Sequence, residues 1–398
     1  MRHTRALAER LTYTDLRFTL LPDVPCILPP DLGSTLRGAL GHALRDMSCP
    51  RTCPLPAAGQ SWSCAHRALC AYSDWFEPVR RPAESPDGSN AADVPRGFIV
   101  RVPPNSARAE GARDPLCFTV RLFGRVAADA SRVVAAVARL ARIGLGPSTL
   151  ETPDEGAWLE LRSAASKLSG TPSERALLER LSVHLPGRAT FELARVEDAL
   201  GRCLWVAGAQ ALVAPVSLPV LPPDFADREA ERVLLHLETP LWIRGSDSKA
   251  PSFEALRVVA LRRIRDLAAY WHGLTGPVDP DDAPSKVTVE TLGFESRRWY
   301  RFSTDQGRKV EQRGLTGTLV LRGPELGRHL WWLEAARALH LGKDTAFGLG
   351  RVRWSLDERE TLHDGIDVRA HERGAGDRGL DGPARAAGDG GSGEPGPA

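Results

Sequence analysis

A glycine-rich stretch near the end of the chain, LHLGKDTAFGLG (residues 339–350), carries residue types that often bind phosphate. It lacks the G-x-x-x-x-G-K-[ST] order, and a predicted helix precedes it while a predicted strand follows. This is the reverse of a mononucleotide-binding loop, in which the glycines lead into a helix. A tight helix-to-strand turn explains the glycines equally well. Lys343, Gly348 and Gly350 remain candidates for contact with a polynucleotide.

The segment in front of this loop, RRWYRFSTDQGRKVEQR (residues 297–313), mixes cationic and aromatic side chains. Residues 291–353 hold twelve Lys and Arg against six acidic residues, whereas the whole chain has a net charge of only +2. RNA binding needs cations for the phosphates and planar groups that stack on bases. The alternative is a solvated hairpin with half of its aromatic side chains in the core. The candidate RNA-binding residues are Arg297, Arg298, Trp299, Arg301, Arg308, Lys309 and Arg313.

One histidine lies on a predicted helix at residues 29–47, where leucines recur every four positions from Leu32 to Leu44. His42 falls outside this apolar stripe, and Arg45 follows three residues later on the same face. A histidine that titrates near neutrality can move the protons in RNA cleavage, and a nearby cation can stabilise charge on the phosphoryl oxygens. The alternative is that His42 merely faces solvent or packs on a strand. Arg37 is a further candidate, for the RNA backbone.

Four of the seven cysteines, Cys49, Cys53, Cys64 and Cys70, lie within 22 residues in the spacing C-x3-C-x10-C-x5-C. The odd total and the absence of an apolar signal segment predict a reducing, cytoplasmic location. Four thiolates can complete a tetrahedral structural zinc site, with free thiols or an iron–sulfur cluster as alternatives and His66 as a substitute ligand. No open coordination position is implied, so we expect no cofactor for catalysis.

The order strand, helix, strand, strand, helix, strand is predicted twice along the chain. In the first half these elements fall at residues 11–21, 29–47, 96–104, 116–124, 128–148 and 156–163. In the second half they fall at residues 231–245, 252–273, 286–303, 313–323, 329–343 and 351–356. In both halves an alanine- and leucine-rich helix runs into a glycine turn before the last strand, which indicates duplication. The sequence predicts an α+β fold of tandem ferredoxin-like (RNA-recognition-motif-like) domains with a cysteine-rich metal-binding insertion.

The domain boundaries follow from this pattern. We expect an N-terminal domain at residues 1–162 with the cysteine-rich insertion at 47–72, a linker region at 163–230 and a C-terminal domain at 231–358. Residues 359–398 are predicted to be a disordered tail, because they are rich in glycine and poor in large apolar side chains. No apolar run is long enough to cross a membrane.

Three of these blocks resemble the precursor-crRNA processing endoribonucleases of the RAMP superfamily of CRISPR-associated proteins. LGSTLRGALGHALR is similar to the first helix of the family, and CFTVRLFGRVAADASRVVAAVARLARIGLG is similar to its first strand-and-helix block. RRWYRFSTDQGRKVEQRGLTGTLVLRG, with the glycine loop, is similar to its C-terminal domain. The resemblance covers about Leu11 to Leu356 and implies the same tandem ferredoxin-like fold.

The resemblance also implies a function. Members of this family bind CRISPR repeat RNA and cleave precursor crRNA without a metal, leaving a 2′,3′-cyclic phosphate and a 5′-hydroxyl. The catalytic histidine, where one is used, often lies on or just after the first helix, which points to His42. Expected partners are repeat RNA or crRNA and subunits of a CRISPR effector complex, with no membrane. The alternatives are a non-catalytic RNA-binding RAMP subunit and a zinc-stabilised protein–protein adaptor.

Overall fold

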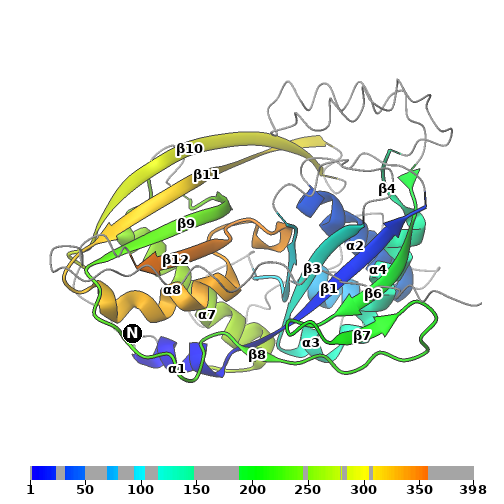
Figure 1. Ribbon diagram of the computed structural model, residues 1–398, viewed down its shortest axis with the longest axis horizontal. Helices are drawn as coiled ribbons and strands as arrows, with labels where there is room; N and C mark the ends of the chain where they lie inside the picture. Colours follow the sequence, from blue (N-terminus) through cyan, green and yellow to red (C-terminus); the bar gives the residue numbers. More distant parts are fainter. Residues whose placement is uncertain are drawn as a thin grey trace, which may run out of the picture. The chain divides into compact units, whose positions relative to one another are not determined.

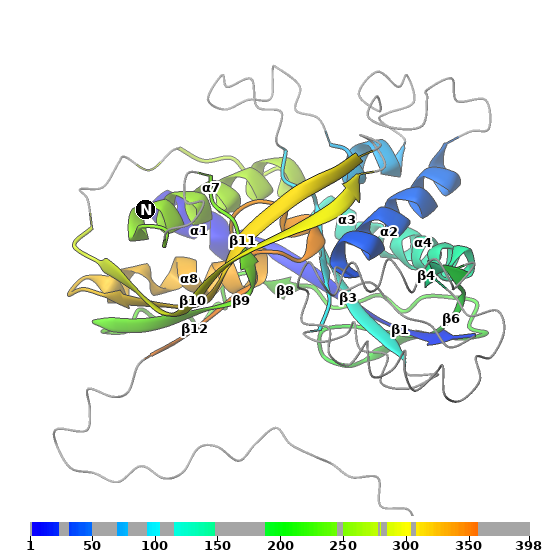
Figure 2. The same ribbon diagram turned by 90° about the horizontal axis from the view of Figure 1, so that it is seen from above.

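The computed structural model describes ten ranges of the chain (Figures 1 and 2). These are residues 2–23, 32–49, 70–78, 94–103, 115–147, 188–244, 250–277, 279, 285–303 and 308–356. The side chains of 146, 147, 188, 301–303, 308 and 309 are not described. The predicted tail lies outside these ranges. Helices and antiparallel sheets occur together, which confirms the α+β class.

The first sheet has the strand order β2-β3-β1-β6-β7, with every pairing antiparallel. Helices α2 and α4 pack against each other on one side of it (Figures 1 and 2). In chain order the elements are α1 (Arg2–Arg10), β1 (Thr12–Pro22), α2 (Leu32–Ser48), the π-helix η3 (Tyr72–Phe76), β2 (Phe98–Arg101), β3 (Leu116–Phe123), α3 (Arg125–Ala128), α4 (Ala130–Ile143), β4 (Leu145–Pro147), β5 (Arg188–Ala189), β6 (Phe191–Glu197), β7 (Cys203–Val206) and β8 (Leu218–Pro219). β8 also pairs with β1, and β4 pairs with β5.

The second sheet has the strand order β10-β11-β9-β12 and is also antiparallel. Helices α7 and α8 lie on one side of it (Figure 1). Its elements are β9 (Arg232–Leu241), α7 (Phe253–His272), β10 (Thr288–Ser303), β11 (Arg308–Arg322), the 3-10 helix η5 (Leu326–His329), α8 (Leu330–Leu339), the 3-10 helix η6 (Thr345–Phe347) and β12 (Val352–Leu356). Alternate residues of β9 are buried, as expected for a strand with one face on a core.

The fourth position of the first sheet is filled from a region that the sequence predicted to be a linker. Strand β6 pairs with β1, with Val196 opposite Phe18, and it buries Phe191, Leu193 and Val196. Strands β6, β7 and β8, which lie within residues 163–230, therefore belong to the first sheet. The strand predicted at 156–163 lies outside the described residues. The apolar spacing in FELARVE was a sequence signal for β6, but proline-rich sequence follows β7.

The two sheets share one buried core, and a buried ion pair helps to join them. Arg121 on β3 donates from Nε and Nη2 to the carboxylate of Asp15 on β1, at 2.7 Å in both hydrogen bonds. Its Nη1 donates to the carbonyl oxygen of Ala338 on α8 at 2.8 Å. A guanidinium that is satisfied from three directions holds α8, and the loop that follows it, against the first sheet.

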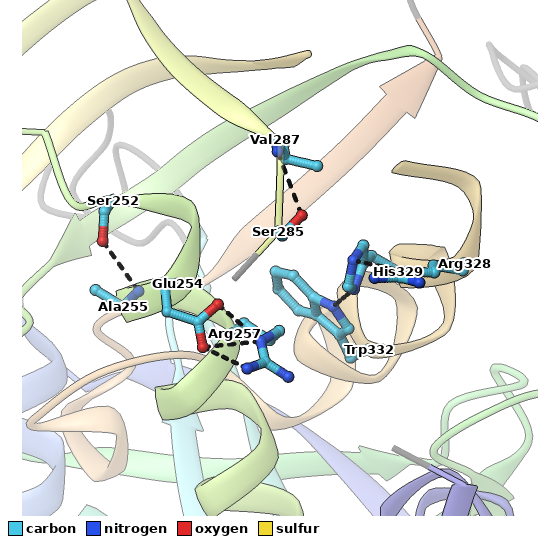
Figure 3. Close-up of polar contacts among 9 residues, drawn as sticks. All are labelled: Ser252, Glu254, Ala255, Arg257, Ser285, Val287, Arg328, His329 and Trp332. Atoms are coloured by element: carbon cyan, nitrogen blue, oxygen red, sulfur yellow. Dashed lines mark hydrogen bonds and ion pairs between the residues drawn. The ribbon is translucent and has the colours of Figure 1, made fainter. Parts of the chain in front are cut away.

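Helix α7 begins and ends as its sequence predicts. The Ser252 hydroxyl accepts a hydrogen bond from the amide of Ala255 at 3.2 Å, which caps the first turn (Figure 3). Gly273 ends the helix with a positive φ of 65°. Among the described residues, no helix combines the length and apolar character that a membrane span requires.

Candidate nucleic-acid interface

His42, the histidine predicted to be catalytic, lies on the solvent-exposed side of helix α2. The leucine stripe from Leu32 to Leu44 is buried, which confirms the apolar face. His42 is exposed and makes no hydrogen bond or ion pair within the described part of the chain, while Arg45 is partly buried. An imidazole in this position can reach a bound ligand without any change in the core.

Most of the other described histidines are held inside the fold. His329 is buried. Its Nδ1 accepts a hydrogen bond from the indole Nε1 of Trp332 at 3.3 Å (Figure 3). Hydrogen bonds also hold the rings of His236, His272 and His340. Of the six histidines in the described ranges, His3 and His42 are the exposed ones, and only His42 lies on the helix that the sequence predicted.

The β10–β11 hairpin places two arginines opposite each other. Arg298 pairs in register with Arg313, so their side chains share one face of the hairpin. Arg298 is exposed and forms no ion pair with any described residue, whereas Arg297 is bridged to Glu295 at 3.2 Å. Like charges directly opposite repel each other, and an anion placed between them relieves that repulsion. Among the described side chains of the hairpin, Arg298 and Arg313 therefore remain candidates for contact with a phosphate.

Trp299 does not have the role that the sequence predicted. Its side chain is 8% exposed and packs with Phe347 and Leu349 of the glycine loop, so its ring is not open to stack on a base. Alternate residues of a strand point to opposite faces, and the next residue, Tyr300, is 55% exposed. The alternative interpretation, with some hairpin aromatics in a core, is correct for Trp299. Among the described side chains of the hairpin, Tyr300 presents an exposed ring, and its hydroxyl donates a hydrogen bond to Glu311 at 3.5 Å.

Two predicted cations meet on a tryptophan that the sequence analysis did not single out. The Nζ of Lys343 lies 4.9 Å from the ring centroid of Trp242, and the guanidinium carbon of Arg313 lies 5.2 Å from it. Cations at such distances are attracted to the face of the ring, which fixes their positions. The amide of Lys343 also donates to the carbonyl oxygen of Trp242 at 2.9 Å. The hairpin and the glycine loop thus meet at Trp242.

The glycines of the loop are structural. Gly348 and Gly350 are buried, with φ of 85° and 68°. A Cβ on Gly348 would lie 2.4 Å from the carbonyl oxygen of Val100, and one on Gly350 would lie 1.8 Å from that of Leu341. Protein backbone occupies the space where a side chain would lie, which explains why both positions require glycine, and contact of these two residues with RNA stays a prediction. The tight-turn interpretation explains them.

Arg37 lies where α2 meets the glycine loop. Its guanidinium carbon is 4.2 Å from the ring centroid of Phe76 and 4.5 Å from that of Phe347. Close by, Gly33 packs on the loop so tightly that a Cβ would lie 2.2 Å from the carbonyl oxygen of Phe347. Arg37 is thus held between two rings, next to the loop that carries Lys343.

The structure therefore separates the predicted residues into two groups. Arg37, Arg313 and Lys343 gather around the glycine loop, with Arg298 opposite Arg313. His42 comes nine residues after Gly33, about 13 Å farther along the helix at 1.5 Å per residue. Within the described residues it makes no polar contact with the first group. The predicted RNA-binding residue Arg37 and the predicted catalytic residue His42 thus lie in different halves of α2.

Some predicted residues are only partly described. The side chains of Arg301, Arg308 and Lys309 lie outside the described part, although their backbones pair within the hairpin. Of the four cysteines, Cys49 follows α2 and Cys70 is buried just before η3, while Cys53 and Cys64 lie outside the described residues. Within the described ranges, no three metal-ligating side chains are grouped. The zinc site stays a prediction.

The cationic hairpin and the glycine loop lie in a part of the chain that matches a known protein family. Residues 235–352 match the family model of the CRISPR-associated endoribonuclease Cas6. This part of the chain is similar to a Cas6 domain. The matched residues contain β10, β11 and the glycine loop, so the family resemblance inferred from these residues is confirmed. Residues 11–164 match a second family model, which is described only as an N-terminal domain.

Solved Cas6 structures are similar to this chain at a low level. Thermus thermophilus Cas6 shares 13% identity over 87% of this chain and 99% of its own, with a TM-score of 0.38. A Cas6 product complex shares 17% identity over 86% and 99%, with a TM-score of 0.37. A Cas6-related protein from Pyrococcus furiosus shares 8% identity over 86% and 98%, with a TM-score of 0.36. Such scores do not establish a common fold. No curated protein sequence matches the chain.

Proposed function

We propose that this protein is an endoribonuclease that binds CRISPR repeat RNA and cleaves precursor crRNA to give guide RNAs. The observation that carries this proposal is the Cas6 match over residues 235–352, the part that holds the cationic hairpin and the glycine loop. The convergence of Arg313 and Lys343 on Trp242 supports it, because the hairpin and the loop act there as one cationic surface. The expected partners are repeat RNA, crRNA and subunits of a CRISPR effector complex.

The proposed chemistry needs no metal, because RNA carries its own nucleophile. A base removes the proton from a 2′-hydroxyl, and the 2′-oxygen attacks the adjacent phosphorus. The bond from phosphorus to the 5′-oxygen breaks, and an acid protonates that oxygen. His42 is the candidate for one of these proton transfers, and Arg45 is the candidate cation for charge on the phosphoryl oxygens. The products are a 2′,3′-cyclic phosphate and a 5′-hydroxyl.

Product analysis with a synthetic repeat RNA tests the function. The purified full chain is incubated with the RNA in excess EDTA, and the new ends are examined by mass spectrometry. We expect a single cut with a cyclic phosphate on one product and a 5′-hydroxyl on the other. A 5′-phosphate product, or cleavage that depends on added Mg²⁺, would contradict the chemistry. Tight binding without any cut would support the non-catalytic RAMP subunit instead.

The proposed fold is a tandem of ferredoxin-like domains. Both sheets are built in the chain order strand, helix, strand, strand, helix, strand. The sheet orders β2-β3-β1-β6 and β10-β11-β9-β12 correspond position by position, with the first strand of each set between the third and the fourth. Duplication of one unit accounts for this correspondence.

We also propose that the four cysteines bind structural zinc, which would supply a crosslink but no chemistry. Cys49 at the end of α2 and Cys70 before η3 are two of the four thiol donors, and α2 packs against η3. Zinc content measured by elemental analysis should be close to one ion per chain, and it should be lost when Cys49 and Cys70 are replaced by serine. Replacement of the isolated Cys203 should leave the zinc content unchanged. Metal-free protein with four titratable thiols in this region would contradict the prediction.

A further inference from the structure

A pocket of about 680 Å³ opens beside the glycine loop, and it is strongly cationic. Helix α7, the loop residues Gly342–Phe347, the segment 242–244 and residues 94–96 form its walls. Its volume lies in the range of small-molecule sites. Two carboxylates, Asp266 and Asp344, line it, against six cations. The cations are Arg37, Arg96, Arg244, Arg262, Arg263 and Lys343.

Backbone carbonyls and aromatic rings help to hold two of these cations in place, and Arg262 forms an ion pair with Asp266 at 3.6 Å. Arg96 donates from Nε to the carbonyl oxygen of Phe76 at 3.0 Å and from Nη1 to that of Val94 at 3.1 Å. Arg37 is held by the two aromatic rings described above. The Arg96 and Arg37 side chains are therefore held in place before any ligand binds, and six cations against two carboxylates give the pocket lining a net positive charge.

Two buried donors at this pocket lack an acceptor within the described part of the chain. Arg263 donates from Nε to the carbonyl oxygen of Leu339 at 3.2 Å, but its Nη2 is buried without a partner. Burial lowers the pKa of Arg263 to about 10, which shows that its charge is poorly solvated. The indole N–H of Trp242 is also buried without a partner. Unsatisfied donors and poorly solvated charge both favour an anionic ligand with several acceptor oxygens.

We propose that this pocket binds backbone phosphates of the RNA at a place separate from the cut. The proposal rests on the proposed function. The pocket is continuous with the cations of the hairpin, because Lys343 lines it and meets Arg313 on the ring of Trp242. A single phosphate needs only two or three donors, whereas this arrangement extends from α7 to the hairpin and suits successive phosphates of one strand.

The pocket and the proposed cutting residue lie on different faces of α2. Arg37 lines the pocket and His42 does not. Five helical positions separate them, which places their side chains about 140° apart around the helix axis. The pocket is therefore an anchor that sets where the strand lies, and it does not touch the reacting atoms.

A double variant of the two most accessible pocket cations tests the proposal. Arg244 is exposed and the Arg262 side chain is 58% exposed, so R244A/R262A should fold normally, with a melting temperature close to that of the wild type. Its matched control is Arg265→Ala, on the same helix but outside the pocket. Affinity is measured with a 2′-O-methyl repeat RNA, which lacks the attacking hydroxyl, at several salt concentrations.

We expect the affinity of the double variant to fall about tenfold or more. The slope of log affinity against log salt should decrease by about one for each phosphate that the variant no longer neutralises. Affinity and slope equal to those of R265A would overturn the proposal. A neutral methylphosphonate at the anchored linkage should weaken the wild type and have little effect on the double variant. If no single linkage behaves in this way, the anchor does not exist.

Two further outcomes separate this proposal from its rivals. If the wild type binds the RNA but never cleaves unmodified repeat RNA, the proposed function fails while the pocket result still stands on binding alone. If AMP binds the wild type saturably and the double variant does not, while RNA affinity is equal in both proteins, the pocket is a free-nucleotide site. That result would overturn RNA as its ligand.

Discussion

The two ends of helix α2 come from one run of sequence, yet their surroundings differ. At the first end Gly33 packs on backbone of the glycine loop, and Arg37 lies between two aromatic rings. In the second half of the helix, His42 is exposed to solvent. The leucine stripe is common to both ends and reveals nothing of this difference. Contacts from other parts of the chain therefore determine which side chains of α2 are exposed to a ligand and which are held in the fold.

The largest expected effect concerns the open end. We predict that His42→Ala lowers the single-turnover cleavage rate by about 10²- to 10⁴-fold, because a proton transfer in the transition state loses its donor or acceptor. Stability should change by less than about 0.5 kcal/mol, since the side chain is exposed. His3→Ala removes the other exposed described histidine and serves as the control. A His42→Ala rate within threefold of that of His3→Ala would show that this end of the helix does no chemistry.

A neighbouring pair on β10 repeats the contrast between packed and open positions. We predict that Trp299→Ala lowers the free energy of unfolding by about 3 kcal/mol, because the cluster with Phe347 and Leu349 loses its largest member. Tyr300→Ala should change stability little and lower RNA affinity, by about 1–3 kcal/mol if the ring stacks on a base. Urea unfolding and RNA titration measure the two effects. If Trp299→Ala lowered RNA affinity without loss of stability, and Tyr300→Ala lowered stability, the roles inferred from burial would be wrong.

The packed end of α2 is tested by two glycines on the same helix. Gly33→Ala should destabilise the fold by about 1–3 kcal/mol, because the new Cβ would lie 2.2 Å from a carbonyl oxygen. Gly38→Ala is the matched control, since a Cβ there meets nothing within 4 Å. It should stabilise the helix by about 0.5–1 kcal/mol. Equal shifts in the midpoint of urea unfolding would mean that the helix end is not packed on the loop.

The smallest effect concerns a buried histidine beside the loop. Burial, with Arg101 and Arg121 nearby, lowers the pKa of His340 well below its ordinary value, so the folded protein keeps the ring neutral. Below about pH 6.5 the unfolded chain takes up a proton that the folded chain does not. The free energy of unfolding therefore decreases as the pH is lowered, by up to about 1.4 kcal/mol per pH unit. His340→Asn should make this slope shallower, because it removes the group whose proton uptake differs between the folded and the unfolded chain.

Unfolding measured from pH 7 to pH 5 checks this prediction. His236 and His272 also have a lowered pKa and keep part of the slope in every variant. The exposed His3→Asn is the control, and its slope should equal that of the wild type. The same slope in His340→Asn would indicate that the His340 ring is protonated in the folded state.

Periodicity in the sequence predicted much of this arrangement. The apolar stripe of α2 and the helix α7 follow from repeats of three or four residues, and strands such as β10 and β11 have a period of two. The outward position of His42 also followed from the stripe. The burial of Trp299 did not, because a strand pattern shows which residues share a face and not which face is covered.

Long-range contacts account for what was missed. Trp242 and Arg263 are separated in sequence from the glycine loop, and only the folded chain brings them together around Lys343. The basic run RRIR at residues 262–265 was a signal for the pocket, but on a helix such a run usually marks a solvated face. The close packing of the loop glycines was also not apparent from the sequence, because it depends on backbone from other parts of the chain.

A single-turnover titration of repeat RNA against the wild type, His42→Ala and Arg298→Ala tests the central claim most directly, because it gives both the apparent Kd and the maximal rate. The division of α2 predicts that His42→Ala lowers the maximal rate and leaves the Kd unchanged. Arg298→Ala should raise the Kd about tenfold and leave the maximal rate near that of the wild type, since an exposed cation opposite Arg313 contributes only to binding. If both variants changed the same parameter, binding and chemistry would not be separated in this protein.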